Sequence, residues 1–225
     1  MAIERLEYID NLKAIGICAV VLGHCSHSLN LLPHQITSFI YLWHMPLFFI
    51  VSGFFIKQLT FKSAILKYSQ YVRAYIVASI VTLASVIIVS ILNDSNILEI
   101  IKNLLISILW GSGASRSAEL FGNLPSIGPV WFLLALFWAC SVYSFLCYKI
   151  KDYYSLFIIC VALWLFGATT INYIRLPFSI QPGLCAILYL YVGDIIRKHS
   201  IFEKFRSFNN IAKFSVIFII FSFTF

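Results

Sequence analysis

The chain has 225 residues, of which 61% are hydrophobic and only 11% are charged, and its formal net charge is +7. Soluble domains carry roughly a quarter charged residues, so this composition excludes an ordinary soluble domain and indicates a membrane protein. Excess positive charge between apolar segments is typical of membrane topology. We therefore expect a lipid bilayer as a partner and no nucleic acid.

Six apolar segments are long enough to cross a bilayer, because a spanning helix needs roughly 20 mostly apolar residues. They cover residues 14–32, 37–56, 74–92, 130–148, 153–171 and 179–196. A seventh begins near Phe214 and is too short to cross, so we expect a chain truncated at its C-terminus. The pattern predicts an all-α polytopic membrane helix bundle, with six complete spans plus a partial seventh, in a single domain over residues 1–225.

The lysines and arginines predict that the N-terminus is cytoplasmic, because cytoplasmic loops carry the excess of basic residues. With this orientation all but three of the 16 lie on the cytoplasmic side. The exceptions are Lys102, Arg116 and Arg175.

Residues 93–128 form a long connection on the non-cytoplasmic side. Within it, apolar residues recur at helical spacing from Ile97 to Ile108, and mostly polar residues lie opposite. This pattern predicts an outer amphipathic helix in the membrane interface. The alternative, a short extra span, would reverse the sidedness of every later loop. The glycine- and serine-rich residues 111–129 are expected to form a flexible loop.

Two histidines fall inside expected spans, His24 in the first and His44 in the second. Counted from the cytoplasmic ends, they lie about 16 Å and 18 Å deep at 1.5 Å per residue. The two imidazoles are therefore predicted at nearly the same depth on adjacent antiparallel helices. Ionisable groups inside membranes are rare and usually functional. His27 lies nearer the outer surface and is better explained by a hydrogen bond to a neighbouring helix.

The residues around both histidines indicate a polar path. Lys13 and His24 are separated by close to three helical turns, and Asp10 falls near the same face. Pro46 is expected to kink the second span beside His44. Irregular backbone at membrane depth is tolerated where it lines a cavity.

Neither a zinc-type spacing nor a disulfide framework is present, so we expect no metal.

Four blocks together resemble one known family. They are RLEYIDNLKAIGICAVVLGH (5–24), HMPLFFIVSGFF (44–55), GPVWFLLALFW (128–138) and LPFSIQPGLCAILYLYVGDIIRK (176–198). In this order they are similar to the membrane O-acyltransferases of acyltransferase family 3. Within that family they resemble the fucose 4-O-acetylase-like branch. The resemblance implies transfer of an acyl group, usually acetyl from acetyl-CoA, to a hydroxyl of a cell-envelope carbohydrate. It also implies that His24 is the essential catalytic residue, and that the family body has nearer ten spans than six.

The chemistry of such a transfer suits the histidines. His24 would take the proton of a sugar hydroxyl, whose oxygen would attack the thioester carbonyl. A transient acyl-imidazole on His24 is an alternative. His44 is the second catalytic candidate. Such an enzyme would be a multi-pass protein of the plasma (inner) membrane, with acyl-CoA and a carbohydrate acceptor as its partners.

Cationic residues near the cytoplasm are candidates for the phosphates of CoA. Arg73 comes first, followed by Lys67 and Lys13. Some relatives carry an Arg-x-x-Arg pair near the start of the third span, whereas this chain has Gln70 in place of the first arginine. Asp10, with Arg5, would orient the inner end of the first span.

Two further features concern the ends of spans. Trp131, at the outer start of its span, is either a membrane-interface tryptophan or a surface on which a sugar stacks. Asp194 and Arg197 are three residues apart and predict a helical ion pair.

The sequence leaves two other functional classes open. One is a transporter or flippase for a carbohydrate precursor, with His24 and His44 as a proton relay. Such a protein would show inverted repeats, which the sequence does not display. The other is an inactive truncated remnant or an assembly partner.

Overall fold

The computed structural model describes residues 6–29, 31–92, 97–111, 113, 116–118, 122–124, 126–171 and 173–201. In this part of the chain the helices are joined by short loops and one small hairpin, which confirms the predicted all-α class. The elements in chain order are α1 (Glu7–Leu29), α2 (His34–Phe54), α3 (Phe61–Leu92), α4 (Ile97–Trp110), β1 (Arg116–Ala118), β2 (Gly122–Leu124), the 3₁₀ turn η1 (Gly128–Val130), α5 (Trp131–Lys149), α6 (Tyr153–Thr170) and α7 (Ile180–Lys198).

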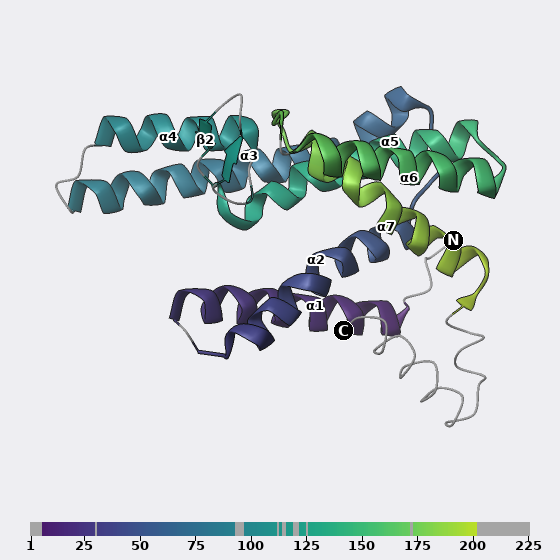
Figure 1. Ribbon diagram of the computed structural model, residues 1–225, viewed down its shortest axis with the longest axis horizontal. Helices are drawn as coiled ribbons and strands as arrows, with labels where there is room; N and C mark the ends of the chain where they lie inside the picture. The colour runs from purple at the N-terminus through teal and green to yellow at the C-terminus, as the bar shows by residue number, and fades with distance from the viewer. Residues whose placement is uncertain are drawn as a thin grey trace.

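The helices form two groups joined by α7. Figure 1 shows α1 and α2 lying side by side in one group, and α3 with α4 and α5 in the other, whereas α6 packs on α7. Helix α7 packs on α2 as well as on α5 and α6, so it connects the two groups. The short strands β1 and β2 pair antiparallel, with Arg116 opposite Leu124. This hairpin lies within the stretch that the sequence predicted as a flexible loop.

Two glycines set the crossing of α2 and α7. A Cβ atom on Gly53 would overlap the backbone of Leu190, and a Cβ atom on Gly193 would overlap the backbone carbonyl of Ile50. Only glycine allows two helix backbones to approach so closely, which is a common device in membrane helix packing. The crossing therefore fixes α2, the helix that carries His44, against the rest of the bundle.

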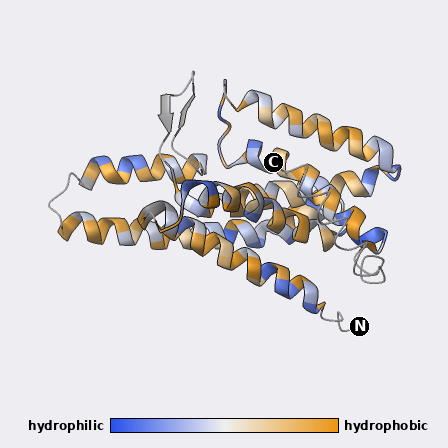
Figure 2. Cartoon of the chain, turned by 60° about the horizontal axis from the view of Figure 1, so that its bottom comes forward, coloured by the Kyte–Doolittle hydropathy of each residue, from blue (hydrophilic) through white to orange (hydrophobic). Residues whose placement is uncertain are grey.

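The core lies where α3, α5 and α7 meet. Ala135, Ala139 and Tyr143 of α5 are fully buried there, together with Ile187 and Leu190 of α7. By contrast, the outward faces of α3 and α6 expose large apolar side chains such as Ile80, Ile88 and Leu165. Figure 2 shows apolar residues along most of the helix lengths. A buried core surrounded by exposed apolar faces is the arrangement expected of helices in contact with lipid.

Five helices in the described part of the chain are long and apolar enough to cross a membrane: α1 over Glu7–Ser26, α2, α3, Gly128–Lys149 with α5, and α6. The sixth expected span, residues 179–196, does form a helix, α7, but this helix is not among the candidates. Its charged end, with Asp194, Arg197 and Lys198, lowers its apolar character. The expected partial seventh span lies outside the described residues. The predicted count of six is therefore not confirmed.

Helix boundaries differ from the apolar segments in a consistent way. Helix α3 begins at Phe61, well before the apolar segment 74–92, because no glycine or proline interrupts the polar residues ahead of it. Helix α1 ends at Leu29, before the predicted limit of 32, because Pro33 follows closely. Hydrophobicity marks the part of a helix that suits lipid, whereas the helix itself extends until a residue breaks it.

The predicted amphipathic helix is present as α4, and it packs against α3. Figures 1 and 2 both show α4 beside the second half of α3, so the two form a helical hairpin. The Tyr75 hydroxyl of α3 donates a 2.6 Å hydrogen bond to the Ile108 carbonyl of α4. Helix α4 therefore packs along α3, and its place in the membrane interface stays a prediction.

Candidate active site

Both candidate histidines line one cavity of about 600 Å³. His24 comes from α1 and His44 from α2, while Trp131 and Phe132 contribute the opposite wall from the start of α5. We call this space the histidine cavity. Its position agrees with the similar depths predicted for the two imidazoles, and its volume falls within the about 300–1,000 Å³ of ligand pockets.

His44 has a defined tautomer. Its side chain is 2% exposed, and its Nδ1 lies 2.7 Å from the Ile40 carbonyl oxygen. A carbonyl only accepts hydrogen bonds, so Nδ1 carries the proton and Nε2 keeps its lone pair when the ring is neutral. The helix backbone therefore orients this imidazole.

Tyr41 contacts both histidines. Its hydroxyl oxygen lies 3.4 Å from His24 Nδ1, and the two rings meet edge to face with centroids 5.8 Å apart. Its ring also meets the His44 ring edge to face at 5.1 Å. Sequence reasoning missed Tyr41, although one signal was available. Tyr41 lies three residues before His44 and therefore shares its helix face.

Glycines on α1 allow this close approach. A Cβ atom on Gly23 would lie 3.3 Å from Ile40 and 3.6 Å from the Tyr41 ring. A Cβ atom on Gly16 would lie 2.9 Å from the end of the Phe48 side chain. The absence of a side chain at Gly23 lets α1 pack closely on α2 beside Tyr41, whereas the Phe48 side chain could move away from a Cβ atom at Gly16.

A second cavity, of about 680 Å³, adjoins the histidine cavity. His24 and Tyr41 line both, whereas His34, Thr37 and Ser38 at the start of α2 line only the second. We call this second space the outer cavity, because the predicted topology places the α1–α2 connection on the non-cytoplasmic side. His24 therefore lies where the two cavities meet.

The structure does not bring the cationic candidates to the histidine cavity. Lys13 lies near the start of α1, 3.8 Å from Asp10, and its Nζ lies 5.3 Å from the centre of the Phe55 ring. On α3, Lys67 lies over the Tyr68 ring and Arg73 is exposed. None of these cations lines the histidine cavity. Arg5 lies outside the described residues, and so does the side chain of His27.

The Asp194 carboxylate forms the predicted ion pair with Arg197, at 3.1 Å, and a second one with Lys198, at 2.6 Å. It also accepts a 3.0 Å hydrogen bond from the Tyr143 hydroxyl of α5. Asp194 is 1% exposed. This cluster therefore connects α7 to α5 and is part of the packing. Among the described residues, no group of three or more His, Cys, Asp or Glu side chains is placed to hold a metal ion.

A family model described as "Acyltransferase domain" matches residues 6–225. The match covers nearly the whole chain and includes the four blocks that carry the resemblance, apart from Arg5 at the start of the first. No curated protein and no solved structure matches the chain.

Proposed function

Because this chain belongs to acyltransferase family 3, we propose that it transfers an acetyl group from acetyl-CoA to a hydroxyl of a cell-envelope or exported carbohydrate, with His24 as the general base. Family membership and the apolar helices make it a membrane acyltransferase. The observation that supports the proposed chemistry is the meeting of His24, Tyr41 and His44 on the wall of one cavity. The fucose 4-O-acetylase-like branch stays a prediction.

In the proposed reaction, His24 Nδ1–H donates to the Tyr41 hydroxyl oxygen, which leaves Nε2 as the proton acceptor. As the sugar oxygen attacks the thioester carbonyl carbon, its proton passes to Nε2. The bond from carbon to sulfur then breaks, and the imidazolium returns the proton to the CoA thiolate. A positioned base of this kind contributes about 10²–10⁴-fold to the rate.

His24 as the acyl carrier is the second route. Here Nε2 attacks the thioester first, CoA leaves as the thiol, and the sugar hydroxyl then takes the acetyl group from the imidazole. The same cavity serves both routes, and both need His24. Tyr41 acts in either route as a positioning residue, because its hydroxyl contacts His24 Nδ1 whereas Nε2 is the nitrogen that reacts. His44 would contribute its Nε2 lone pair to the polar wall.

The donor would approach from the cytoplasmic side, where Lys13, Lys67 and Arg73 would attract the phosphates of CoA. Their separate positions favour a diffuse electrostatic attraction over a single phosphate clamp. Asp10 would orient Lys13 through their ion pair. The acceptor would approach through the outer cavity and stack against Trp131. We propose the plasma (inner) membrane as the location, because acetyl-CoA would be supplied from the cytoplasm and the carbohydrate acceptor belongs to the cell envelope.

Transfer of radiolabelled acetyl from acetyl-CoA to envelope polysaccharide tests the proposal, in membranes that contain the full-length protein. His24→Ala is expected to lower incorporation by at least about 10²-fold. The matched control is His199→Ala, which removes an exposed histidine at the end of α7 that does not line the histidine cavity. Both variants are compared at equal protein level.

Normal labelling with His24→Ala would refute the catalytic role of His24. A loss of labelling in both histidine variants would point to damaged folding rather than lost chemistry. Label that wild-type protein retains in the absence of acceptor, that hydroxylamine or acid releases, and that His24→Ala lacks would favour the acyl-imidazole route over direct transfer.

A further inference from the structure

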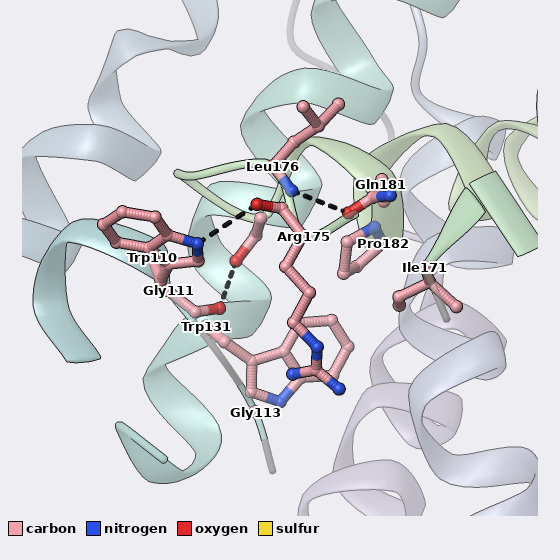
Figure 3. A pocket seen from close by; sticks show the side chains of 10 residues that line it. Trp110, Gly111, Gly113, Trp131, Ile171, Arg175, Leu176, Gln181 and Pro182 are labelled. Atoms are coloured by element: carbon pink, nitrogen blue, oxygen red, sulfur yellow. Dashed lines mark hydrogen bonds between the residues drawn. The ribbon is translucent and has the colours of Figure 1, made fainter. Parts of the chain in front are cut away.

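A third cavity, of about 220 Å³, adjoins the histidine cavity and contains one cationic side chain, Arg175. The indoles of Trp110 and Trp131 and the side chain of Gln181 also line it. Figure 3 shows the Arg175 side chain extending across this space, with its guanidinium group beside the Trp131 indole. We call this cavity the arginine pocket.

The backbone that carries Arg175 is fixed on both sides. The Trp110 indole N–H donates a 3.1 Å hydrogen bond to the Arg175 carbonyl, and the Leu176 N–H donates a 2.9 Å bond to Gln181 Oε1. Gln181 is 2% exposed, and its amide N–H groups donate to the Ile174 carbonyl and to the Thr170 hydroxyl. These bonds hold the loop before any ligand binds, which reduces the entropy lost on binding.

The loop is also attached to the end of α4. The Phe178 and Ser179 N–H groups donate to the carbonyls of Leu109 and Trp110, at 3.0 and 3.1 Å. Phe178 and Ser179 have φ values of 58° and 52°, a conformation that costs energy in residues other than glycine. Such strain persists only where the surroundings impose it. The pocket is therefore assembled from α4, α5 and α7 around a rigid loop.

Trp131 is shared between the two sites. Its side chain and Gly113 line the arginine pocket and also the histidine cavity. A group bound beside Arg175 would thus lie against the same indole that forms the wall opposite His24. No aspartate or glutamate is present among the described residues that line the arginine pocket. The pocket thus combines a cation with two aromatic surfaces, next to the candidate catalytic base.

We propose that the arginine pocket binds an anionic group, a carboxylate or a phosphate, carried by the carbohydrate acceptor, and so directs an acceptor hydroxyl toward His24. This inference rests on the proposed function. Guanidinium groups form paired hydrogen bonds with carboxylates and phosphates, and indoles pack on the C–H faces of sugar rings. The volume is below the about 300 Å³ of the smallest pockets for whole drug-like ligands, so the pocket suits one sugar unit of a longer acceptor.

Binding of three monosaccharide probes tests the inference without any need for turnover. The probes are glucose, glucuronate and glucose 6-phosphate, titrated into the detergent-solubilised full-length protein while tryptophan fluorescence is followed. The anionic probes are expected to bind at least about tenfold more tightly than glucose, because charged hydrogen bonds are roughly twice as strong as neutral ones. The anionic probe that binds more tightly shows which group, a carboxylate or a phosphate, the pocket prefers.

Two variants of Arg175 test whether this residue causes the preference for the anionic probes. Arg175→Gln is expected to abolish the difference between charged and neutral probes, and Arg175→Lys to retain part of it. The matched control Lys102→Gln removes an exposed cation of α4 that does not line the pocket, and it should preserve the preference. Elution volume and thermal unfolding of each variant establish that it is folded.

Equal affinities for all three probes would overturn the inference, as would failure of both anionic probes to bind. A preference that survives in Arg175→Gln would also overturn it, because another cation would then be responsible. His24→Ala separates this inference from the proposed function. Selective binding by His24→Ala, together with wild-type protein that transfers no acetyl, would refute the acyl-transfer chemistry and leave the anion site standing.

Discussion

Gly193 of α7 lies against the backbone carbonyl of Ile50 in α2, with no space for a Cβ atom between them. The contact joins a helix near the end of the described chain to the helix that carries His44. Together with Gly53 and the Leu190 backbone, it makes the α2–α7 crossing a contact of backbone on backbone. Backbone atoms cannot rotate away as side chains can, so this crossing tolerates little change.

Gly193→Ala is expected to destabilise the protein by about 1–3 kcal/mol, the usual cost of overpacking. Thermal unfolding in detergent measures the effect. Gly16→Ala is the matched control, because a Cβ atom there meets only the ends of the Phe48 and Leu47 side chains, which can move. An unfolding temperature for Gly193→Ala equal to that of Gly16→Ala would show that the crossing is looser than described.

Tyr41→Phe is expected to lower kcat for acetyl transfer by about 2–10-fold, because it removes one neutral hydrogen bond worth about 0.5–1.5 kcal/mol from His24. The ring contacts with both histidines remain, so the KM for acetyl-CoA should not change. Steady-state kinetics measure both constants. Tyr154→Phe, at an exposed position on α6, serves as control. A Tyr41→Phe enzyme with wild-type kcat would remove Tyr41 from the mechanism.

Asp194→Asn is expected to destabilise the protein by about 1–3 kcal/mol, since the buried carboxylate loses its charged hydrogen bonds to Arg197 and Lys198. Arg197 and Lys198 are partly exposed and can turn to water, which limits the loss. Tyr143→Phe removes one donor to the same carboxylate and should cost less, about 1 kcal/mol. Chemical denaturation compares the two, and the reverse order would contradict the cluster as described.

Asp152 gives a pH-dependent contribution to stability. It precedes α6, and the Ser155 N–H donates to its carboxylate at 2.8 Å, which lowers the pKa of Asp152 below its ordinary value. A carboxyl group with a lowered pKa in the folded state stabilises the protein above its unfolded pKa of about 3.9. This contribution disappears as the pH falls through the folded value.

The wild type should therefore exceed Asp152→Ala in unfolding temperature at pH 7, and the difference should shrink as the pH falls below about 4. Unfolding temperatures of both proteins across this range test the prediction. A gap that stays constant down to the lowest pH would show that the charge of Asp152 has no part in the cap.

The helices and the pairing of the histidines could be predicted from the sequence because both depend on local periodicity. His24 and His44 lie on consecutive antiparallel helices, and counting residues along each helix placed them at similar depths. Tyr41 shares the helix face of His44, so the same reasoning could have included it. The cations proposed to attract the donor could not be placed in this way, because Lys13 and Arg73 belong to different helices whose packing the sequence does not specify.

The arginine pocket depends on packing between distant segments and left no local signal. Trp110 and Arg175 both line this pocket and are joined by a hydrogen bond, yet they are 65 residues apart in the sequence. From the sequence, Arg175 is only a basic residue expected on the non-cytoplasmic side. The packing of α4 on α3 could not be predicted for the same reason. An amphipathic pattern indicates that one face is covered but does not distinguish a lipid surface from the side of α3.

The bonds from Phe178 and Ser179 to the Leu109 and Trp110 carbonyls connect helices that are far apart in the sequence. They join the end of α4 to the start of α7, and α7 in turn meets α2 at the glycine crossing. A continuous path of backbone contacts therefore leads from the hairpin of α3 and α4 to the helix that carries His44.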